Sequence, residues 1–208
     1  MKGLKLLLIL VAFLQNVATA QANTGIYKMV KQDDIITLYE RWINNDKGET
    51  VRELKAVLLV KSDMNEVTAL LTNNAKGKKW NTSASEYKVI GHATDGYWIT
   101  YTRYDIPWPF EDQDCSLRYT VVNKTSSNVE IMFDEYTDPQ FPLHEGVTRI
   151  AGTHGKWILE DQRNGYVKLT YFISTDRSKK VPKWCSDMVV HSNMFKTLTA
   201  FKNTLEKE

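Results

Sequence analysis

Apolar and polar residues alternate along short segments that occupy most of the chain. The clearest alternation lies in four segments: 52–60, 116–121, 129–134 and 167–173. In the second of these, Leu117, Tyr119 and Val121 share one side, whereas Arg118 falls on the other. A period of two places each apolar set on one face of a sheet, and so predicts antiparallel strands with one buried face. Four further strands are expected at 36–42, 87–93, 98–104 and 155–160.

Apolar residues at helical spacing predict two helices between and after these strands. Ser62 is suited to an N-cap, and Met64, Val67 and Leu70 recur behind it at helical intervals. The longer helix begins near Pro182 and keeps its apolar spacing for about six turns. A further short helix is expected over 26–31.

A sheet with one apolar face must cover that face with another element, and only the last helix is long enough to do so. The pattern therefore predicts an α+β fold in which a curved antiparallel sheet wraps around a long C-terminal helix. Such a shell leaves a gap between sheet and helix, which is where a ligand would bind. The chain shows no internal repeat and no linker, so one domain is expected.

The N-terminus has the layout of a secretory signal peptide. Lys2 and Lys5 precede the apolar run 6–14, which is followed by the small residues of 18–20. We therefore expect residues 1–20 to be removed and 21–208 to form the domain, in the periplasm or outside the cell. Removing both lysines takes the formal charge from +2 to 0. A neutral chain argues against a nucleic-acid partner and against tight electrostatic docking on acidic membranes.

Catalytic and metal-binding motifs are missing from the sequence. It contains no His-Glu-x-x-His, no nucleophile elbow, no phosphate-binding glycine loop and no Cys-x-x-Cys. Its 4 histidines lack metal-ligand spacing. The acidic residues Glu111, Asp112 and Asp114 are expected in a solvated loop. We therefore predict no catalytic residue, no metal and no cofactor.

Two segments carry a family resemblance. In 105–119, Pro107-Trp108-Pro109 leads through an acidic loop into a strand; in 155–184, a Lys-Trp pair opens a strand, and Val181-Pro182-Lys183-Trp184 opens the last helix. In order and spacing, these segments resemble the START family (steroidogenic acute regulatory protein-related lipid transfer) in its compact bacterial form. The resemblance covers essentially all of the chain after residue 20 and implies the helix-grip fold.

The resemblance implies a non-enzymatic protein that binds, and transfers, a lipid or another apolar ligand in an internal cavity. Transient membrane contact and a monomeric state are expected. The implied cavity wall consists of Tyr101, Leu117, Tyr119, Phe133, Trp157, Tyr171, Met188 and Phe195. The implied gate is the loop with Pro107, Trp108, Pro109 and Phe110. Two alternatives stay open: a polyketide cyclase/aromatase-like or hydrolase enzyme on the same fold, and an interaction module with a filled core.

The two cysteines, Cys115 and Cys185, lie at the edges of the implied gate. An oxidising compartment allows a disulfide between them. The alternative is two separate buried thiols.

Overall fold

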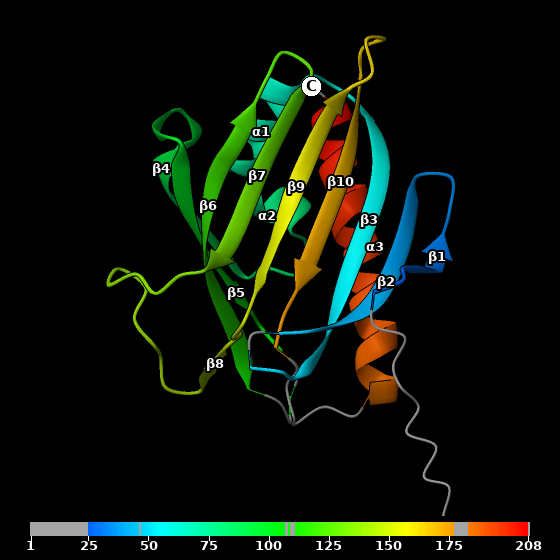
Figure 1. Cartoon of the computed structure of the whole chain (residues 1–208). Helices are drawn as coiled ribbons and strands as arrows, with labels where there is room; N and C mark the ends of the chain where they lie inside the picture. The colour runs from blue at the N-terminus through cyan, green and yellow to red at the C-terminus, as the bar shows by residue number, and fades with distance from the viewer. Residues whose placement is uncertain (1–24, 46, 107, 109–110, 177–182, 208) are drawn as a thin grey trace, which may run out of the picture.

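The computed structural model describes residues 25–45, 47–106, 108, 111–176 and 183–207 (Figure 1). For Ala93 and for residues 183–189 it describes the backbone alone. The predicted signal peptide, residues 1–20, lies outside the described residues. Among the described helices, none combines the length and the apolar character that crossing a membrane requires.

Ten strands form one strongly curved sheet in the described part of the chain, in the order β1-β2-β3-β10-β9-β7-β6-β5-β4 (Figure 1). The strands are β1 (Lys28–Gln32), β2 (Ile36–Asn44), β3 (Thr50–Lys61), β4 (Glu86–His92), β5 (Tyr97–Tyr104), β6 (Asp112–Lys124), β7 (Asn128–Glu135), β8 (Val147–Arg149), β9 (His154–Asp161) and β10 (Tyr166–Ser174). Neighbours along this order pair antiparallel, while β8 lies parallel to β6. The pairing of β10 with β3 joins the N-terminal strands to the rest of the sheet.

The helix α3 (Lys183–Glu206) lies along the concave side of the sheet, and the short helices α1 (Met64–Leu71) and α2 (Gly77–Trp80) cover one end of it (Figure 1). A 3-10 turn, η1 (Ala93–Asp95), links β4 to β5. Phe195, Leu198 and Phe201 of α3 are buried in the same core cluster as the inward-facing residues of the sheet. Each such side chain contributes about 2 kcal/mol through burial of its apolar surface. The predicted α+β fold, a curved sheet around a C-terminal helix, is confirmed.

Some predicted elements were wrong in detail. The segment 26–31 forms no helix: Lys28–Gln32 is β1, whose Met29 pairs with Tyr39 of β2. Its backbone groups are satisfied by the neighbouring strand, which a local pattern does not reveal. The N-cap of α1 is Asp63 and not Ser62, because the Asp63 carboxylate accepts the backbone N–H groups of Asn65 and Glu66. The elements α2 and β8 were not predicted.

Candidate ligand-binding interior

Aromatic rings run in an unbroken chain through the interior between the sheet and α3. Successive rings have centroids 4.2 to 5.8 Å apart, and the angles between their planes range from stacked to edge-on. The chain runs Tyr87, Trp80, Phe201, Trp157, Tyr171, Phe133, Tyr119 and Trp98. Offset and edge-on contacts of this kind add stability beyond the burial of area. The interior is therefore walled by aromatic side chains from α2, α3 and the strands β4, β5, β6, β7, β9 and β10.

One glycine allows this arrangement. Gly155 of β9 pairs with Phe133 of β7, and a Cβ atom at position 155 would lie 2.6 Å from the Phe133 ring and 2.0 Å from the Phe172 carbonyl oxygen. Neither the ring nor the neighbouring backbone has room to give way. The absence of a side chain at Gly155 thus lets the Phe133 ring lie across β9, where it stacks on Tyr171.

The structure brings most of the predicted wall residues together on the interior face. The core cluster contains Leu117, Tyr119, Phe133, Trp157 and Phe195 as buried residues and Tyr171 as a partly buried one. The ring of Phe195 is also covered by the Lys31 ammonium, 4.3 Å from its centroid. The Met188 side chain lies outside the described residues. That these residues line a ligand cavity remains a prediction.

Tyr101 was assigned to the wrong face of the sheet. On β5, the side chains of Trp98, Thr100 and Thr102 point inward, whereas Tyr101 belongs to a separate cluster with Ile99. Its ring stacks on Phe141, with centroids 4.6 Å apart. The residues after β7 cover this outer face, so β5 is buried on both sides and its sequence lacks the contrast that would set its orientation.

Two tyrosines of the interior stay only partly buried. Tyr104 and Tyr171 pack against the core and keep some accessible surface. The protein nevertheless surrounds both so completely that burial raises the pKa of each phenol far above its usual range. Tyr104 is the last residue of β5, which leads toward the predicted gate loop.

Neutral polar side chains line one flank of this interior. Thr100, Thr102 and Tyr104 of β5 and Tyr119 of β6 form what we call the hydroxyl stripe. Within it, the Thr102 hydroxyl lies beside the Tyr104 phenol, and the Thr100 hydroxyl lies beside that of Tyr119. The amide of Asn81, which follows α2, donates to the Tyr104 oxygen at 3.3 Å. No sequence pattern indicated the stripe, because threonine is common in strands on either face.

Cys115 lies beside the hydroxyl stripe as a free, buried thiol. The disulfide that the sequence allowed between Cys115 and Cys185 is therefore not formed, and the Cys185 side chain lies outside the described residues. Burial, with a smaller contribution from the negative charge of Asp114, raises the pKa of the Cys115 thiol to about 12. The thiol is consequently protonated at neutral pH and a poor nucleophile.

A buried ion pair lies on the opposite, outer face of the sheet. The parallel pairing of β8 with β6 sets Arg149 beside Asp114, with Nε 2.5 Å and Nη2 2.9 Å from the two carboxylate oxygens. The Tyr101 hydroxyl donates to Asp114 at 3.1 Å, and Arg149 also donates to the carbonyl oxygens of Phe141 and Pro142. Asp114 was expected in a solvated loop, but its side chain is only 1% exposed. The pair fastens the segment after β7 to the sheet.

A second charged cluster ties α3 to the sheet. His191 of α3 hydrogen-bonds the Glu40 carboxylate of β2 through Nε2 at 2.9 Å, and Arg52 of β3 lies 3.5 Å from the same carboxylate oxygen. All three side chains are largely buried. This cluster lies toward the N-terminal half of α3, whereas the C-terminal half is held by apolar burial. No group of three or more potential metal ligands occurs among the described residues.

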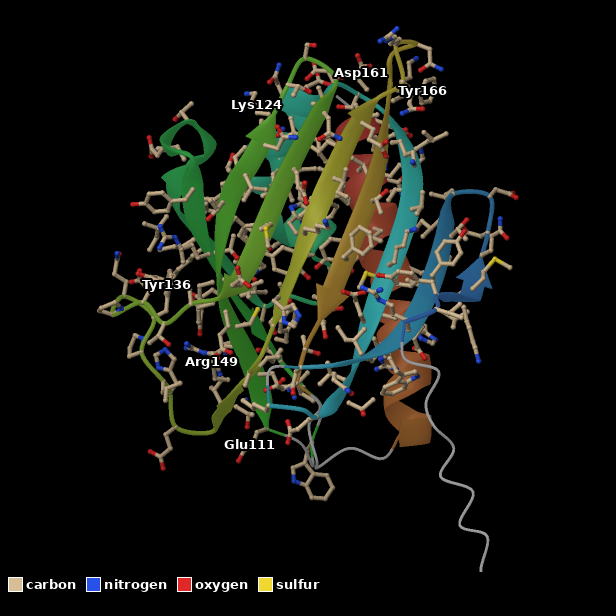
Figure 2. All side chains as sticks on the ribbon, viewed as in Figure 1. Glu111, Lys124, Tyr136, Arg149, Asp161 and Tyr166 are labelled. Carbon is tan, nitrogen blue, oxygen red and sulfur yellow. The ribbon has the colours of Figure 1, made fainter. Side chains whose placement is uncertain are left out.

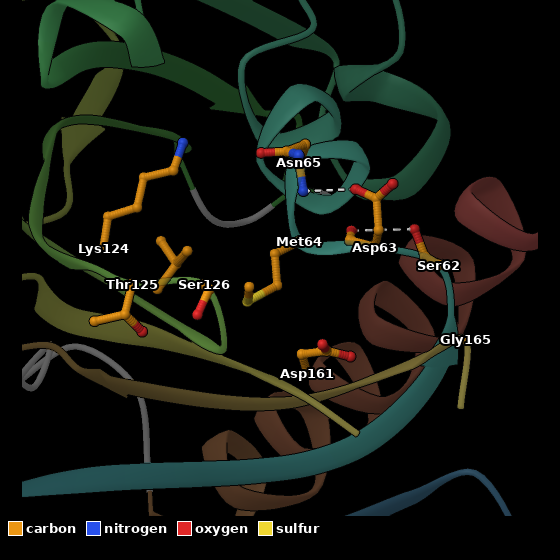
Figure 3. A pocket seen from close by; sticks show the side chains of 10 residues that line it. Ser62, Asp63, Met64, Asn65, Lys124, Thr125, Ser126, Asp161 and Gly165 are labelled. Carbon is orange, nitrogen blue, oxygen red and sulfur yellow. Dashed lines mark hydrogen bonds between the residues drawn. The ribbon is translucent and has the colours of Figure 1, made fainter. Parts of the chain in front are cut away.

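A surface pocket of about 410 Å³ lies near the N-terminus of α1 (Figure 3). Its lining includes Asp63 and Met64, Lys124 at the end of β6, and Asp161 at the end of β9. Figure 2 shows Lys124 and Asp161 at the end of the molecule opposite Arg149 and Glu111. None of the predicted wall residues lines this pocket.

The predicted gate loop is described only at Trp108, whose side chain is 91% exposed. Pro107, Pro109 and Phe110 lie outside the described residues. Glu111, which follows them, hydrogen-bonds Thr148 of β8 through its carboxylate.

A curved antiparallel sheet that holds a long terminal helix over an aromatic interior defines a protein of the helix-grip class. The chain belongs to the START domain family, whose model matches residues 20–208. Over its full length it is 24% identical to an uncharacterised protein of Pseudomonas aeruginosa, whose full length the match also covers.

Solved structures show the same fold. A STAR-related lipid transfer protein from Xanthomonas axonopodis superposes with a TM-score of 0.73 at 23% identity, covering 86% of this chain and 98% of that one. The human StAR-related lipid transfer protein 5 gives 0.68 at 15% identity, covering 87% and 86%. The aromatase/cyclase ZhuI of Streptomyces sp. R1128 gives 0.53 at 13% identity, covering 76% and 94%.

Proposed function

We propose that the protein binds a lipid or another apolar ligand in the interior between its sheet and α3. The observation that carries this proposal is the aromatic interior between the sheet and α3, in which Tyr104 and Tyr171 stay only partly buried. Apolar groups of a ligand placed there would leave water, and each buried methylene would contribute about 0.8 kcal/mol. Membership of the START family supports the same function, because the similar structures include lipid transfer proteins.

In this proposal the protein is exported and carries its apolar ligand. The basic, apolar and small residues of 1–20 support export to the periplasm or beyond the cell. The exposed Trp108 supports a gate at the loop between β5 and β6 that also touches membranes, since tryptophan favours the membrane interface. In this proposal the carrier is a monomer that exchanges its ligand with membranes.

Binding without catalysis accounts best for the interior chemistry. Burial raises the pKa of Cys115, Tyr104 and Tyr119, so all three stay protonated and uncharged near neutral pH. None of them is poised as a base or nucleophile there. The alternative is an aromatase/cyclase-like or hydrolase activity on the same fold, in keeping with the similarity to ZhuI.

Native mass spectrometry of the gently purified protein tests the binding function. We expect mass increments that organic extraction removes and that identify the bound lipid. Ile173→Trp should abolish them, because Ile173 is partly buried on the interior face and an indole would occupy the space beside Tyr171. Lys168→Trp, on the outer face of the same strand, serves as the matched control. Equal lipid content in both variants, or no uptake by the extracted wild-type protein, would refute the proposal.

A further inference from the structure

The hydroxyl stripe is unusual for a protein core. Thr100 and Thr102 are only 2% and 3% exposed, and Asn81 and Tyr119 are each 8% exposed. Burying a hydroxyl or amide carries a desolvation cost that hydrogen bonds must offset. A wall with no binding role would be filled more stably by valine and phenylalanine of the same shape.

The stripe faces the interior between the sheet and α3. Tyr104, one of its members, packs against the core and keeps some accessible surface. The far flank of the interior, on β3 and β10, presents Leu54, Ala56 and Ile173. A ligand between the two flanks therefore meets the hydroxyl stripe on one side and, on the other, mainly apolar side chains with the Tyr171 phenol among them.

Charge around the stripe excludes anions. Among the described residues, Arg149 lies across the sheet and already bonds both oxygens of Asp114, and Arg52 is engaged by Glu40. Asp114 adds a negative charge next to Cys115, and together with burial it raises the pKa of that thiol. A carboxylate or phosphate at the stripe would lose its hydration without gaining a cation.

We propose that the ligand carries an uncharged hydrogen-bonding group, an alcohol or an ester, and that the hydroxyl stripe and Asn81 bind this group. This inference rests on the proposed lipid-binding function and narrows it to neutral amphiphiles. The hydroxyls of Thr102 and Tyr104 both donate and accept hydrogen bonds, so they match an alcohol in either role.

Two probes with the same C18 chain, oleyl alcohol and oleate, test the inference. Titration of the delipidated protein at pH 8, where oleate is ionised, should show the alcohol binding at least about tenfold more tightly. The double variant Thr102→Val with Tyr104→Phe should weaken alcohol binding about tenfold, because it removes two hydroxyls without changing shape. Thr170→Val is the matched control, since Thr170 is buried on the outer face of β10.

The outcomes separate the inference from the proposed function. Oleate binding as tightly as the alcohol, or alcohol binding unchanged in the folded double variant, would overturn the inference and leave lipid binding intact. Failure of the wild-type protein to bind either probe or to extract lipid from phosphatidylcholine vesicles would overturn both. Thermal melting verifies folding, and Tyr104→Phe alone replaces the double variant if that variant does not fold.

Discussion

Two aspartates of β6 pair with arginines in different surroundings. The side chains of Asp114 and Arg149 are 1% and 12% exposed, whereas those of Asp112 and Arg103 are 26% and 35% exposed. Removing one partner of a buried pair strands the other charge, so Asp114→Asn should lower the free energy of unfolding by about 3 kcal/mol. Asp112→Asn should change it little, because water screens that pair. Urea unfolding of both variants checks this, and similar small losses would contradict it.

The buried thiol of Cys115 predicts a loss of stability in alkali. Its pKa rises from 9.0 in an unfolded chain to about 12 in the fold. Between these values the unfolded chain releases the proton while the folded protein keeps it, so the free energy of unfolding falls as pH rises. The contribution is fully present below about pH 9 and is lost toward pH 12. Urea unfolding from pH 8 to 11 should show a shallower decline in Cys115→Ala than in the wild type; identical slopes would contradict this origin.

Single residues were predictable where a strand has one buried face. Tyr119 is buried and Arg118 is exposed, with its guanidinium over the Tyr97 ring, as alternation on β6 predicted. Tyr101 was misplaced because β5 is buried on both faces. Asp114 was misjudged because its arginine partner lies 35 residues away in the sequence. The alternation of apolar and polar residues shows which face of a strand is buried only when the other face is exposed. It does not show which residues from distant parts of the sequence will pair.

The start of α1 depends on a capping box. The Asp63 carboxylate accepts two backbone N–H groups, at 2.7 and 2.9 Å, while the Glu66 carboxylate accepts the Asp63 N–H. Asp63→Ala should therefore destabilise the protein by about 1 kcal/mol. Ser62→Ala is the neighbouring control and should be nearly neutral. The Ser62 hydroxyl makes two exposed hydrogen bonds, to the Glu66 carboxylate and to the Asp63 carbonyl oxygen. Thermal melts distinguish the two variants. A larger loss of stability in Ser62→Ala than in Asp63→Ala would contradict Asp63 as the N-cap and favour Ser62, the residue predicted from the sequence.

Longer helices and strands were predicted from the sequence more successfully than short ones. The spacing of apolar residues located α1 and the long α3, because several turns repeat the pattern. The short β1 was taken for a helix, and its true partner, Tyr39 opposite Met29, is visible only once β2 is in place. A three-residue strand such as β8 and a single turn such as α2 are too short to show any period.

The proposed gate belongs to the scale of the whole molecule, because it would connect the interior to a membrane. Trp108 has almost no packing to lose, so Trp108→Ser should leave the melting temperature unchanged. The same change should slow ligand exchange with vesicles several-fold, if the indole contacts the membrane interface. Tyr166→Ser, at the start of β10, removes an exposed aromatic ring from the opposite end and is the control. Unchanged exchange in Trp108→Ser would move the gate elsewhere.

The pairing of β3 with β10 determines how late in folding the sheet can be completed. Ser174 donates its hydroxyl to the Arg52 carbonyl oxygen across 122 residues of sequence. Contacts of such range form late, because the intervening chain must first be confined. During synthesis β3 has no partner on this side until residue 174 has left the ribosome, so the sheet cannot close early. An exported chain would benefit, since it would reach the translocation machinery still unfolded and would complete its sheet on the far side of the membrane.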